Sequence, residues 1–242
     1  MLSVKNLNVI VGKKKIIKSF SFDFKKGKIY VIMGPNGSGK SSLAFTLMGH
    51  PLYQISKSSR ISINKKRIEG LEADKRAKEG LFLSFQSPLS LSGVSVRELI
   101  QLALSSEKKD PLAIRKQLYK YVHELKIPEE LIGRSLNDGA SGGEKKKLEA
   151  LQAAMLDKQV QIFDELDTGV DVDALKSIAT FLKKHQGDKT YIIITHYNRI
   201  LKYLAPDRVL ILKEGVLVKE GDRKLAKLIE KEGYEKVNGK KK

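Results

Sequence analysis

The sequence predicts an α/β fold that combines a mostly parallel central sheet, an antiparallel β portion and an inserted helical subdomain. Short apolar runs of β-type residues alternate with stretches of helical spacing along most of the 242 residues. One of these runs leads directly into a glycine-rich turn and a helix. A stretch in the middle of the chain breaks the alternation, because helical patterns follow one another there without an apolar run between them.

The first part of the chain is predicted to contain strands. Apolar residues recur along residues 2–9, and the phenylalanines of residues 20–24 alternate at period two. Residues 29–33 form a continuous apolar run, which is the pattern of a strand buried on both faces. A helical pattern follows at residues 42–48, after the glycine-rich turn.

Further strands are expected where short apolar runs recur, at residues 81–85, 162–163, 191–194 and 209–212. Helical spacing over residues 95–132 indicates the inserted subdomain, which we place at residues 87–156. The chain is then a single domain, residues 1–242, made of a catalytic core (1–86 and 157–242), the subdomain and a disordered tail at residues 238–242.

Composition narrows the possible classes of function. With 41% hydrophobic and 31% charged residues, the chain is typical of a globular protein. No segment approaches the roughly 18 consecutive apolar residues that cross a bilayer, and the N-terminus shows no signal-peptide pattern. We therefore expect a cytoplasmic protein with no membrane insertion, or a protein of an organelle stroma if a transit peptide has been removed. Because there is no cysteine, the chain cannot itself hold an iron–sulfur cluster through thiolates.

The net charge of +18 would suit a nucleic acid or an anionic membrane as partner. The charge is mostly lysine in short runs spread along the chain, whereas base reading favours arginine within a docking motif. A solvated basic surface is the simpler interpretation. We expect no specific nucleic-acid partner.

The glycine-rich turn carries the strongest functional signal. Its residues and the one that follows are Gly34, Pro35, Asn36, Gly37, Ser38, Gly39, Lys40, Ser41 and Ser42. The turn matches the P-loop pattern in full, and it lies after a buried strand and before a helix, as the pattern requires. Its glycines let backbone N–H groups converge on phosphate oxygens, and the helix start adds its dipole. We expect Lys40 to reach the β- and γ-phosphates of a nucleotide and the Ser41 hydroxyl to bind Mg²⁺.

A second motif narrows the nucleotide-binding families. Ser141, Gly142 and Gly143 resemble the signature of ABC ATPases, with Ala140 and Glu144 in place of its leucine and glutamine. Taken alone, this stretch would be a plausible cap for the helical pattern that continues to residue 156. Its position after the P-loop favours the signature.

Residues 160–165 resemble the Walker B strand of the same ATPases. The resemblance implies that Asp164 binds Mg²⁺ through water and that Glu165 acts as general base toward the attacking water. A solvated acidic turn is the alternative for this motif alone. Single residues complete the resemblance: Gln86 at the Q-loop, which touches Mg²⁺ and the attacking water, Asp171 at the D-loop, and His196 at the switch position that contacts the γ-phosphate.

The resemblance implies the ABC ATPase fold, a P-loop NTPase fold, with ATP and Mg²⁺ as ligands. In such ATPases the nucleotide lies between the P-loop of one subunit and the signature of another. Ser141 and Gly143 would then contact the γ-phosphate held by a second copy, and dimerisation would be transient and ATP-dependent. An aromatic residue that stacks on adenine in many members is missing around residues 9–11, so phosphate and Mg²⁺ contacts would dominate affinity.

Several local strings resemble the SufC family rather than transporter ATPases. They are residues 33–41, 46–51, 141–146, 164–175 and 195–201. The most specific features are Tyr197 and Arg199 beside the switch histidine. This resemblance implies SufB- and SufD-like scaffold partners, on which ATP-driven dimerisation acts during iron–sulfur cluster assembly. The alternatives are the nucleotide-binding subunit of an ABC membrane transporter and a non-catalytic, nucleic-acid-associated ABC protein.

Lysines 145–147 follow the signature and suggest a control of the general base. We expect Lys146 to pair with Glu165 or Asp164 in the resting subunit, with three solvated lysines as the alternative. Such a pair would make Glu165 a poor base until the site rearranges.

Residues 88–94 are expected to form a loop carrying Leu89, Leu91 and Val94. Together with the helix start at residues 96–100, this loop is a candidate docking patch for a soluble scaffold protein. Inward packing of these apolar side chains is the alternative.

Overall fold

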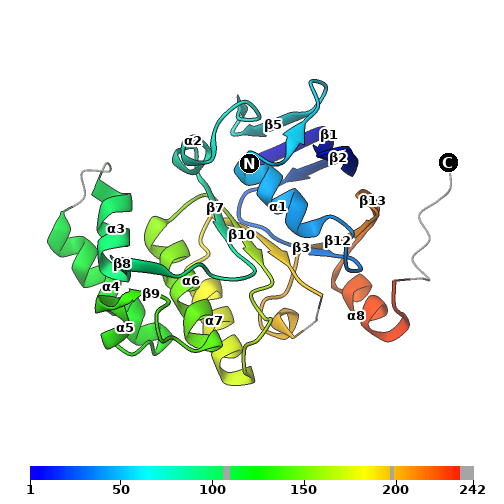
Figure 1. Ribbon diagram of the computed structural model, residues 1–242. Helices are drawn as coiled ribbons and strands as arrows, with labels where there is room; N and C mark the ends of the chain where they lie inside the picture. Colours follow the sequence, from blue (N-terminus) through cyan, green and yellow to red (C-terminus); the bar gives the residue numbers. More distant parts are fainter. Residues whose placement is uncertain (106–109, 197–198, 235–242) are drawn as a thin grey trace. The chain divides into compact units, whose positions relative to one another are not determined.

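The computed structural model describes residues 1–105, 110–196 and 199–234, and the chain forms two compact units (Figure 1). The first unit contains residues 1–83, 158–165 and those from 186 onward, and the second contains residues 84–157 and 166–185. Residues 84–86, 157 and 166–185, which were expected in the catalytic core, group with the helical unit in the structure. The helix of residues 166–185, α7 (Val172–Lys184), buries its apolar face against α6 (Gly142–Leu156) and α4 (Pro111–Leu125) of that unit. The expected tail at residues 238–242 lies outside the described residues.

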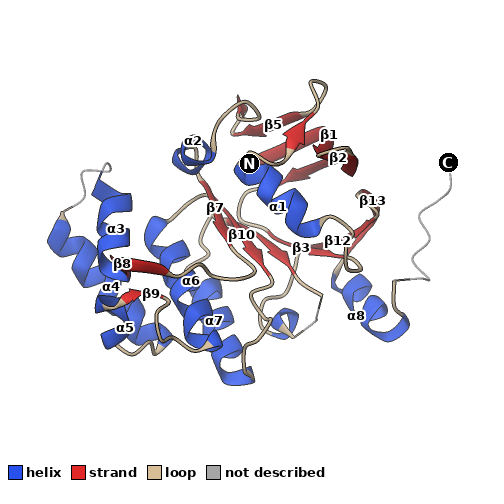
Figure 2. Ribbon diagram, viewed as in Figure 1, coloured by secondary structure: helices blue, strands red, loops and turns tan. Residues whose placement is uncertain are grey.

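The main sheet has the strand order β13-β12-β3-β11-β10-β7. Its strands are β3 (Ile29–Met33), β7 (Leu81–Ser84), β10 (Val160–Asp164), β11 (Thr190–Ile194), β12 (Arg208–Lys213) and β13 (Val216–Gly221). In parallel register, Ile162 of β10 lies beside Ile192 of β11, which lies beside Tyr30 of β3. All residues of β3, β10 and β11 are buried, which explains the apolar runs of β3 and β11, while β10 also buries Gln161 and Asp164. The predicted α/β fold is confirmed, with β13 antiparallel at one edge (Figure 2).

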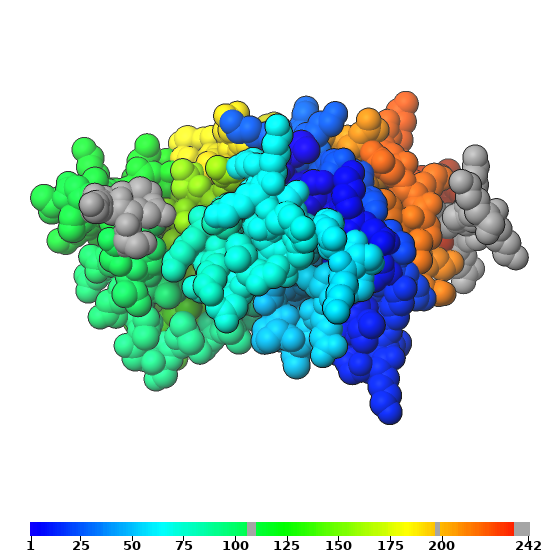
Figure 3. Space-filling model, turned by 90° about the horizontal axis from the view of Figure 1, so that it is seen from above, coloured from blue at the N-terminus to red at the C-terminus, as the bar shows by residue number. Residues whose placement is uncertain are grey.

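The antiparallel portion is a separate sheet of the first unit, with the order β2-β1-β5-β6 and β4 on β1. Its strands are β1 (Leu2–Val11), β2 (Lys14–Phe24), β4 (Gln54–Ile55), β5 (Arg60–Ile63) and β6 (Lys66–Arg67). In Figure 3 the blue start of the chain lies beside the cyan residues around 60, in agreement with the pairing of β1 and β5. The inward-facing Phe20 and Phe24 of β2 are buried, which accounts for their alternation.

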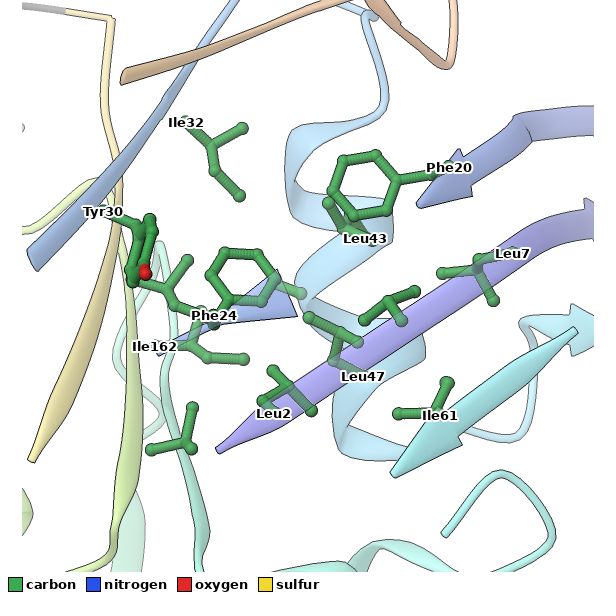
Figure 4. Packing of buried hydrophobic residues seen from close by; sticks show 14 of the residues in the cluster. Leu2, Leu7, Phe20, Phe24, Tyr30, Ile32, Leu43, Leu47, Ile61 and Ile162 are labelled. Carbon is green, nitrogen blue, oxygen red and sulfur yellow. The ribbon is translucent and has the colours of Figure 1, made fainter. Parts of the chain in front are cut away.

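Helix α1 (Lys40–Met48) lies in the core of the first unit. Leu43 and Leu47 are buried on it and pack among Phe20 and Phe24 of β2 and Ile162 of β10 (Figure 4). The remaining helices of this unit are α2 (Ala73–Lys78), the short 3₁₀ helix η2 (Ile200–Lys202) and α8 (Arg223–Glu232). The packing fixes α1, and therefore the turn that precedes it, against the sheet.

The second unit is mostly helical. It contains β8 (Leu91–Ser95), α3 (Val96–Leu104), α4 (Pro111–Leu125), α5 (Glu130–Gly133), β9 (Ser135–Leu136), α6 (Gly142–Leu156) and α7. The loop expected at residues 88–94 is in part a strand, because β8 pairs with β9. Val96 and Ile100 of α3 are buried, so they pack inward and cannot form a docking patch. None of the helices in the described residues is long and apolar enough to cross a membrane.

Candidate active site

The P-loop lies between β3 and α1 and depends on glycine at defined positions. A Cβ atom at Gly34 would lie 2.0 Å from the carbonyl oxygen of Leu212 and 2.7 Å from Ser38 Oγ, so no other residue fits. Gly39 has φ +99°, a left-handed conformation that L side chains rarely adopt. The N–H of Gly215, in the β12–β13 turn, donates to Ser38 O at 2.9 Å and holds the loop from outside. Asn36 and Gly37 are exposed at the tip, while Pro35, Ser41 and Ser42 are half-buried.

Helix α1 starts with unused backbone donors. Among the described residues no side chain caps it, and the Leu43 N–H donating to Gly39 O at 2.8 Å is the first helical bond of the turn. The N–H groups of the preceding residues therefore have no partner within the helix. A helix start of this kind binds phosphate oxygens.

Lys40 is buried, and its ammonium group closes the loop in this state. Its Nζ donates to Gly34 O at 3.0 Å and to Pro35 O at 3.1 Å. Burial lowers the pKa of Lys40 to about 8, because loss of water disfavours the charged form more than the nearby Glu165 and Asp164 favour it. Bound phosphates would restore a full counter-charge to this lysine.

Asp164 ends β10, and Glu165 follows it in a strained backbone conformation. Glu165 has φ +52°, and its N–H donates to Ile194 O at 2.8 Å, just past the parallel pairing of β10 and β11. For a residue with a Cβ, this left-handed conformation costs about 1–2 kcal/mol and is typical of functional sites. Glu165 Oε1 lies 3.1 Å from His196 Nε2.

His196 follows β11 and contacts the predicted general base. Burial lowers the pKa of His196 from its usual 6.5, the charge of Lys40 lowers it further, and Glu165 opposes both effects. The imidazole is therefore mostly neutral at pH 7, and it can donate an N–H to the Glu165 carboxylate. The P-loop, Asp164, Glu165 and His196 all belong to the first unit.

In the second unit, the predicted signature is the start of α6. Glu144 N–H donates to Ser141 Oγ at 3.3 Å, and Ser141 N–H donates to Glu144 Oε2 at 2.8 Å, which forms a capping box. These bonds lower the pKa of Glu144. Glutamate at this position thus serves as the second half of the cap. A Cβ at Gly142 would meet Gly169 O at 2.8 Å, so glycine is required there too.

Gly143 lies beside α7, whose N-cap is Asp171. The Asp171 carboxylate accepts the Ala174 N–H at 2.8 Å, and this bond lowers the pKa of Asp171. The predicted D-loop aspartate therefore has a structural role in starting α7.

The structure contradicts the expected pairing of Lys146 with Glu165 or Asp164. Lys146 Nζ donates to Phe85 O at 2.8 Å, to Gln86 O at 3.1 Å and to Glu149 Oε2 at 3.0 Å, so all of its N–H donors are used within the second unit. Burial raises the pKa of Glu149, and Lys146 opposes this shift.

Glu149 was missed by sequence analysis, although its place three residues after Lys146 on one helix was a usable signal. It also accepts the Phe85 N–H at 3.0 Å, so this ion pair holds the backbone next to Gln86.

The residues predicted to bind Mg²⁺ are Ser41, Asp164 and, in the second unit, Gln86. Among the described residues no group of three or more His, Asp or Glu side chains could hold a metal ion alone. A hydroxyl and a buried carboxylate nevertheless fit Mg²⁺, which takes few protein ligands and completes its shell with phosphate oxygens and water.

Tyr197, which is one of the residues that resemble the SufC family most specifically, lies outside the described residues.

The model of the ABC transporter family matches residues 17–168. A protein of Escherichia coli K12 named "Probable ATP-dependent transporter SufC" is 41% identical over 97% of both chains. "Vegetative protein 296" of Bacillus subtilis 168 is 38% identical over 97% of this chain and 92% of its own. "Probable ATP-dependent transporter ycf16" of Cyanophora paradoxa is also 38% identical, over 98% of this chain and 95% of its own.

Solved structures show the same fold. An ATP-binding cassette of an ABC transporter in its ADP conformation superposes with a TM-score of 0.78 and 24% identity, covering 98% of this chain and 96% of its own. The CbiO1 component of a Clostridium perfringens ABC transporter complex gives a TM-score of 0.76 at 27% identity, covering 98% and 94%.

Proposed function

The chain belongs to the ABC transporter family and is an ATPase of that type, and on this premise we propose that it drives conformational change of a SufB–SufD-type scaffold during iron–sulfur cluster assembly. The observation that carries the proposal is the 41% identity to a protein named SufC over 97% of both chains. The local strings around the P-loop, the signature and His196 support the same subfamily.

The first unit contains the groups that ATP hydrolysis needs. ATP phosphates would take the place of the carbonyls that now accept from Lys40, and the free N–H groups of α1 would bind the phosphate oxygens. Ser41 and Asp164 of the first unit would hold Mg²⁺, which neutralises charge on the phosphates. Glu165 accepts a proton from the attacking water, and His196 orients the Glu165 carboxylate and contacts the γ-phosphate.

The signature residues would complete the site of a second copy. Ser141 and Gly143 lie at the start of α6, where the capping box uses the N–H groups of Ser141 and Glu144 but not those of Gly142 and Gly143, and a helix start favours an anion. We propose that ATP brings two copies together in this way and that hydrolysis releases them. A solved cassette dimer bound to ADP and phosphate, with a TM-score of 0.78 and 20% identity, has the same fold.

The second unit offers a docking surface of two leucines. Leu89 is 62% exposed and Leu91 is 41% exposed, whereas Val94 is half-buried. We propose that Leu89 and Leu91 contact the scaffold protein. This docking patch is smaller than the one predicted from sequence, which also included Val94 and residues 96–100.

The test is binding of the purified chain to SufB- and SufD-like proteins, with ATPase activity measured alone and in the complex. Leu91→Glu should weaken the complex tenfold or more, because the new carboxylate would be desolvated without a partner. Leu112→Glu, at a leucine that is 74% exposed on α4, is the matched control and should bind normally. Equal binding by Leu91→Glu and the wild type would remove the patch from the proposal.

Several relatives are named as probable transporters, which favours a second candidate, the nucleotide-binding subunit of a membrane transporter. Such a subunit would fractionate with membranes through an integral partner. We propose a cytoplasmic location instead, and co-purification from the native cell distinguishes the two functions.

A further inference from the structure

Asn137 lies in the second unit and holds the backbone of the docking patch that Leu89 and Leu91 form. It is only 4% exposed, and its Nδ2 group donates to Leu89 O at 2.7 Å. Among the described residues this is the only hydrogen bond of the side chain, because its Oδ1 is buried without a partner. The bond fixes the peptide group of Leu89, while the Leu89 side chain stays exposed.

The backbone of Asn137 also favours this residue type. Asn137 has φ +62°, and asparagine adopts this left-handed conformation more readily than most other residues with a Cβ. It lies in the turn between β9 and α6, where the Asp138 N–H donates to Ser135 O at 3.0 Å. The predicted signature, residues 141–143, follows this turn.

Ser135 and β9 hold the rest of the docking patch. The Ser135 Oγ accepts the Gly93 N–H at 3.0 Å, and Leu136 lies opposite Leu91 where β9 pairs with β8 (Figure 1). Leu136 is buried, so β9 is packed into the second unit while Leu91 stays exposed. The patch therefore rests on residues 135–137, which are themselves anchored.

The docking segment is also bonded to the chain on the other side of the signature. Lys146, in the helix that the signature begins, donates to Phe85 O at 2.8 Å and to Gln86 O at 3.1 Å. Residues 85–93 are thus tied to the chain both before and after residues 141–143. Coupling between two sites is carried by connected hydrogen bonds and packed side chains of this kind. A displacement of the patch would therefore reach the signature.

We propose that Asn137 links scaffold docking to the signature. A scaffold protein bound at Leu89 and Leu91 sets the position of residues 141–143 toward a second copy, and ATP-driven pairing of two copies in turn changes the affinity for the scaffold. The second effect follows from the first, because coupling between two binding events is reciprocal. Asn137 is a positioning residue that acts through the Leu89 peptide group. The inference rests on the proposed docking of a scaffold protein and adds its regulation.

The test compares the Kd of the purified scaffold protein for the full chain in MgATP and in MgADP. Every protein carries Glu165→Gln, so that ATP persists. Asn137→Gly is the test variant, because glycine keeps the left-handed backbone and removes the side chain. Asn64→Gly is the matched control. Asn64 is also left-handed, at φ +48°, and its Nδ2 donates to Gln159 Oε1 at 2.7 Å, but it lies in the first unit.

The ratio of the two Kd values measures the coupling. We expect a ratio of at least about fivefold in the parent protein and in Asn64→Gly, and below about twofold in Asn137→Gly. A loss of packing alone would weaken binding equally in both nucleotides and leave the ratio unchanged. Ser135→Ala, which removes the acceptor of the Gly93 N–H, should lower the ratio as well and serves as the test if Asn137→Gly does not fold.

Three results would count against the inference, and each has a different meaning. A ratio in Asn137→Gly equal to that of the parent would overturn the role of Asn137. A parent protein that binds the scaffold equally in both nucleotides would overturn the link to the signature and leave the docking proposal standing. A parent protein that binds no scaffold would overturn the proposed function, and this inference with it.

Discussion

Replacing Arg76 should destabilise the first unit strongly, because its guanidinium group ties α2 to the C-terminal end of α1. Arg76 is only 2% exposed. It donates to the carbonyls of Thr46 and Leu47 at 2.8 and 2.9 Å, and to those of Leu71 and Glu69 at 2.8 Å each. Burial lowers its pKa to about 10, so it stays charged at pH 7, and a cation at this end of a helix also offsets the helix dipole.

The magnitude follows from these contacts. Four bonds from a charged donor contribute about 6–12 kcal/mol in total at roughly 1.5–3 kcal/mol each. Desolvation of the buried cation removes several kcal/mol of this sum. We therefore expect Arg76→Met to lower the free energy of unfolding by about 3–5 kcal/mol, a large share of the roughly 5–15 kcal/mol typical of a domain.

Urea denaturation at pH 7, followed by circular dichroism, measures this loss. Arg76→Lys is the informative comparison, because it keeps the charge but cannot reach all four carbonyls, and it should lose an intermediate amount. A loss below about 1 kcal/mol in Arg76→Met would refute the reasoning, since desolvation would then cancel the hydrogen bonds.

Three further outcomes are expected. Lys40→Ala should abolish ATP turnover, measured by phosphate release, because it removes the ammonium group of the P-loop that is expected to bind the β- and γ-phosphates; turnover at the wild-type rate in this variant would exclude the P-loop assignment. Glu165→Gln should bind MgATP yet lose at least a hundredfold in kcat, with a dimer accumulating in light scattering, and normal turnover would remove Glu165 as base. The free energy of unfolding should fall as the pH drops below about 6.5, because His196 then binds a proton in the unfolded chain but less readily in the folded one. In His196→Gln the free energy of unfolding should depend less steeply on pH, and equal slopes in the variant and the wild type would contradict the lowered pKa of His196.

The elements predicted correctly are those whose pattern reflects their own burial. The apolar run of residues 29–33 became β3, because a strand covered on both faces is apolar throughout. The helical spacing over residues 95–132 became α3 and α4, because an amphipathic helix leaves a periodic pattern. The strand β8 (Leu91–Ser95) was not predicted from sequence, because it is short, polar and interrupted by Gly93. Its pairing with β9 is decided by tertiary contacts.

In the candidate site, too, some features could be predicted from the sequence and others could not. The P-loop could be read from residue types alone, because phosphate binding demands those types in that order. The partner of Lys146 was harder to predict, because Glu149 is favoured by its i,i+3 spacing on one helix while Glu165 and Asp164 are favoured by the family resemblance, and the fold selects Glu149.

The left-handed backbone of Glu165 has a consequence for selection on this protein. Glycine would remove the steric cost of φ +52° at that position, about 1–2 kcal/mol. The residue that best suits the backbone is therefore not the residue that performs the chemistry. A screen that selects for thermostability alone should enrich Glu165→Gly, and the enriched variants should lose ATP turnover. At this position the residue favoured by folding differs from the residue needed for catalysis.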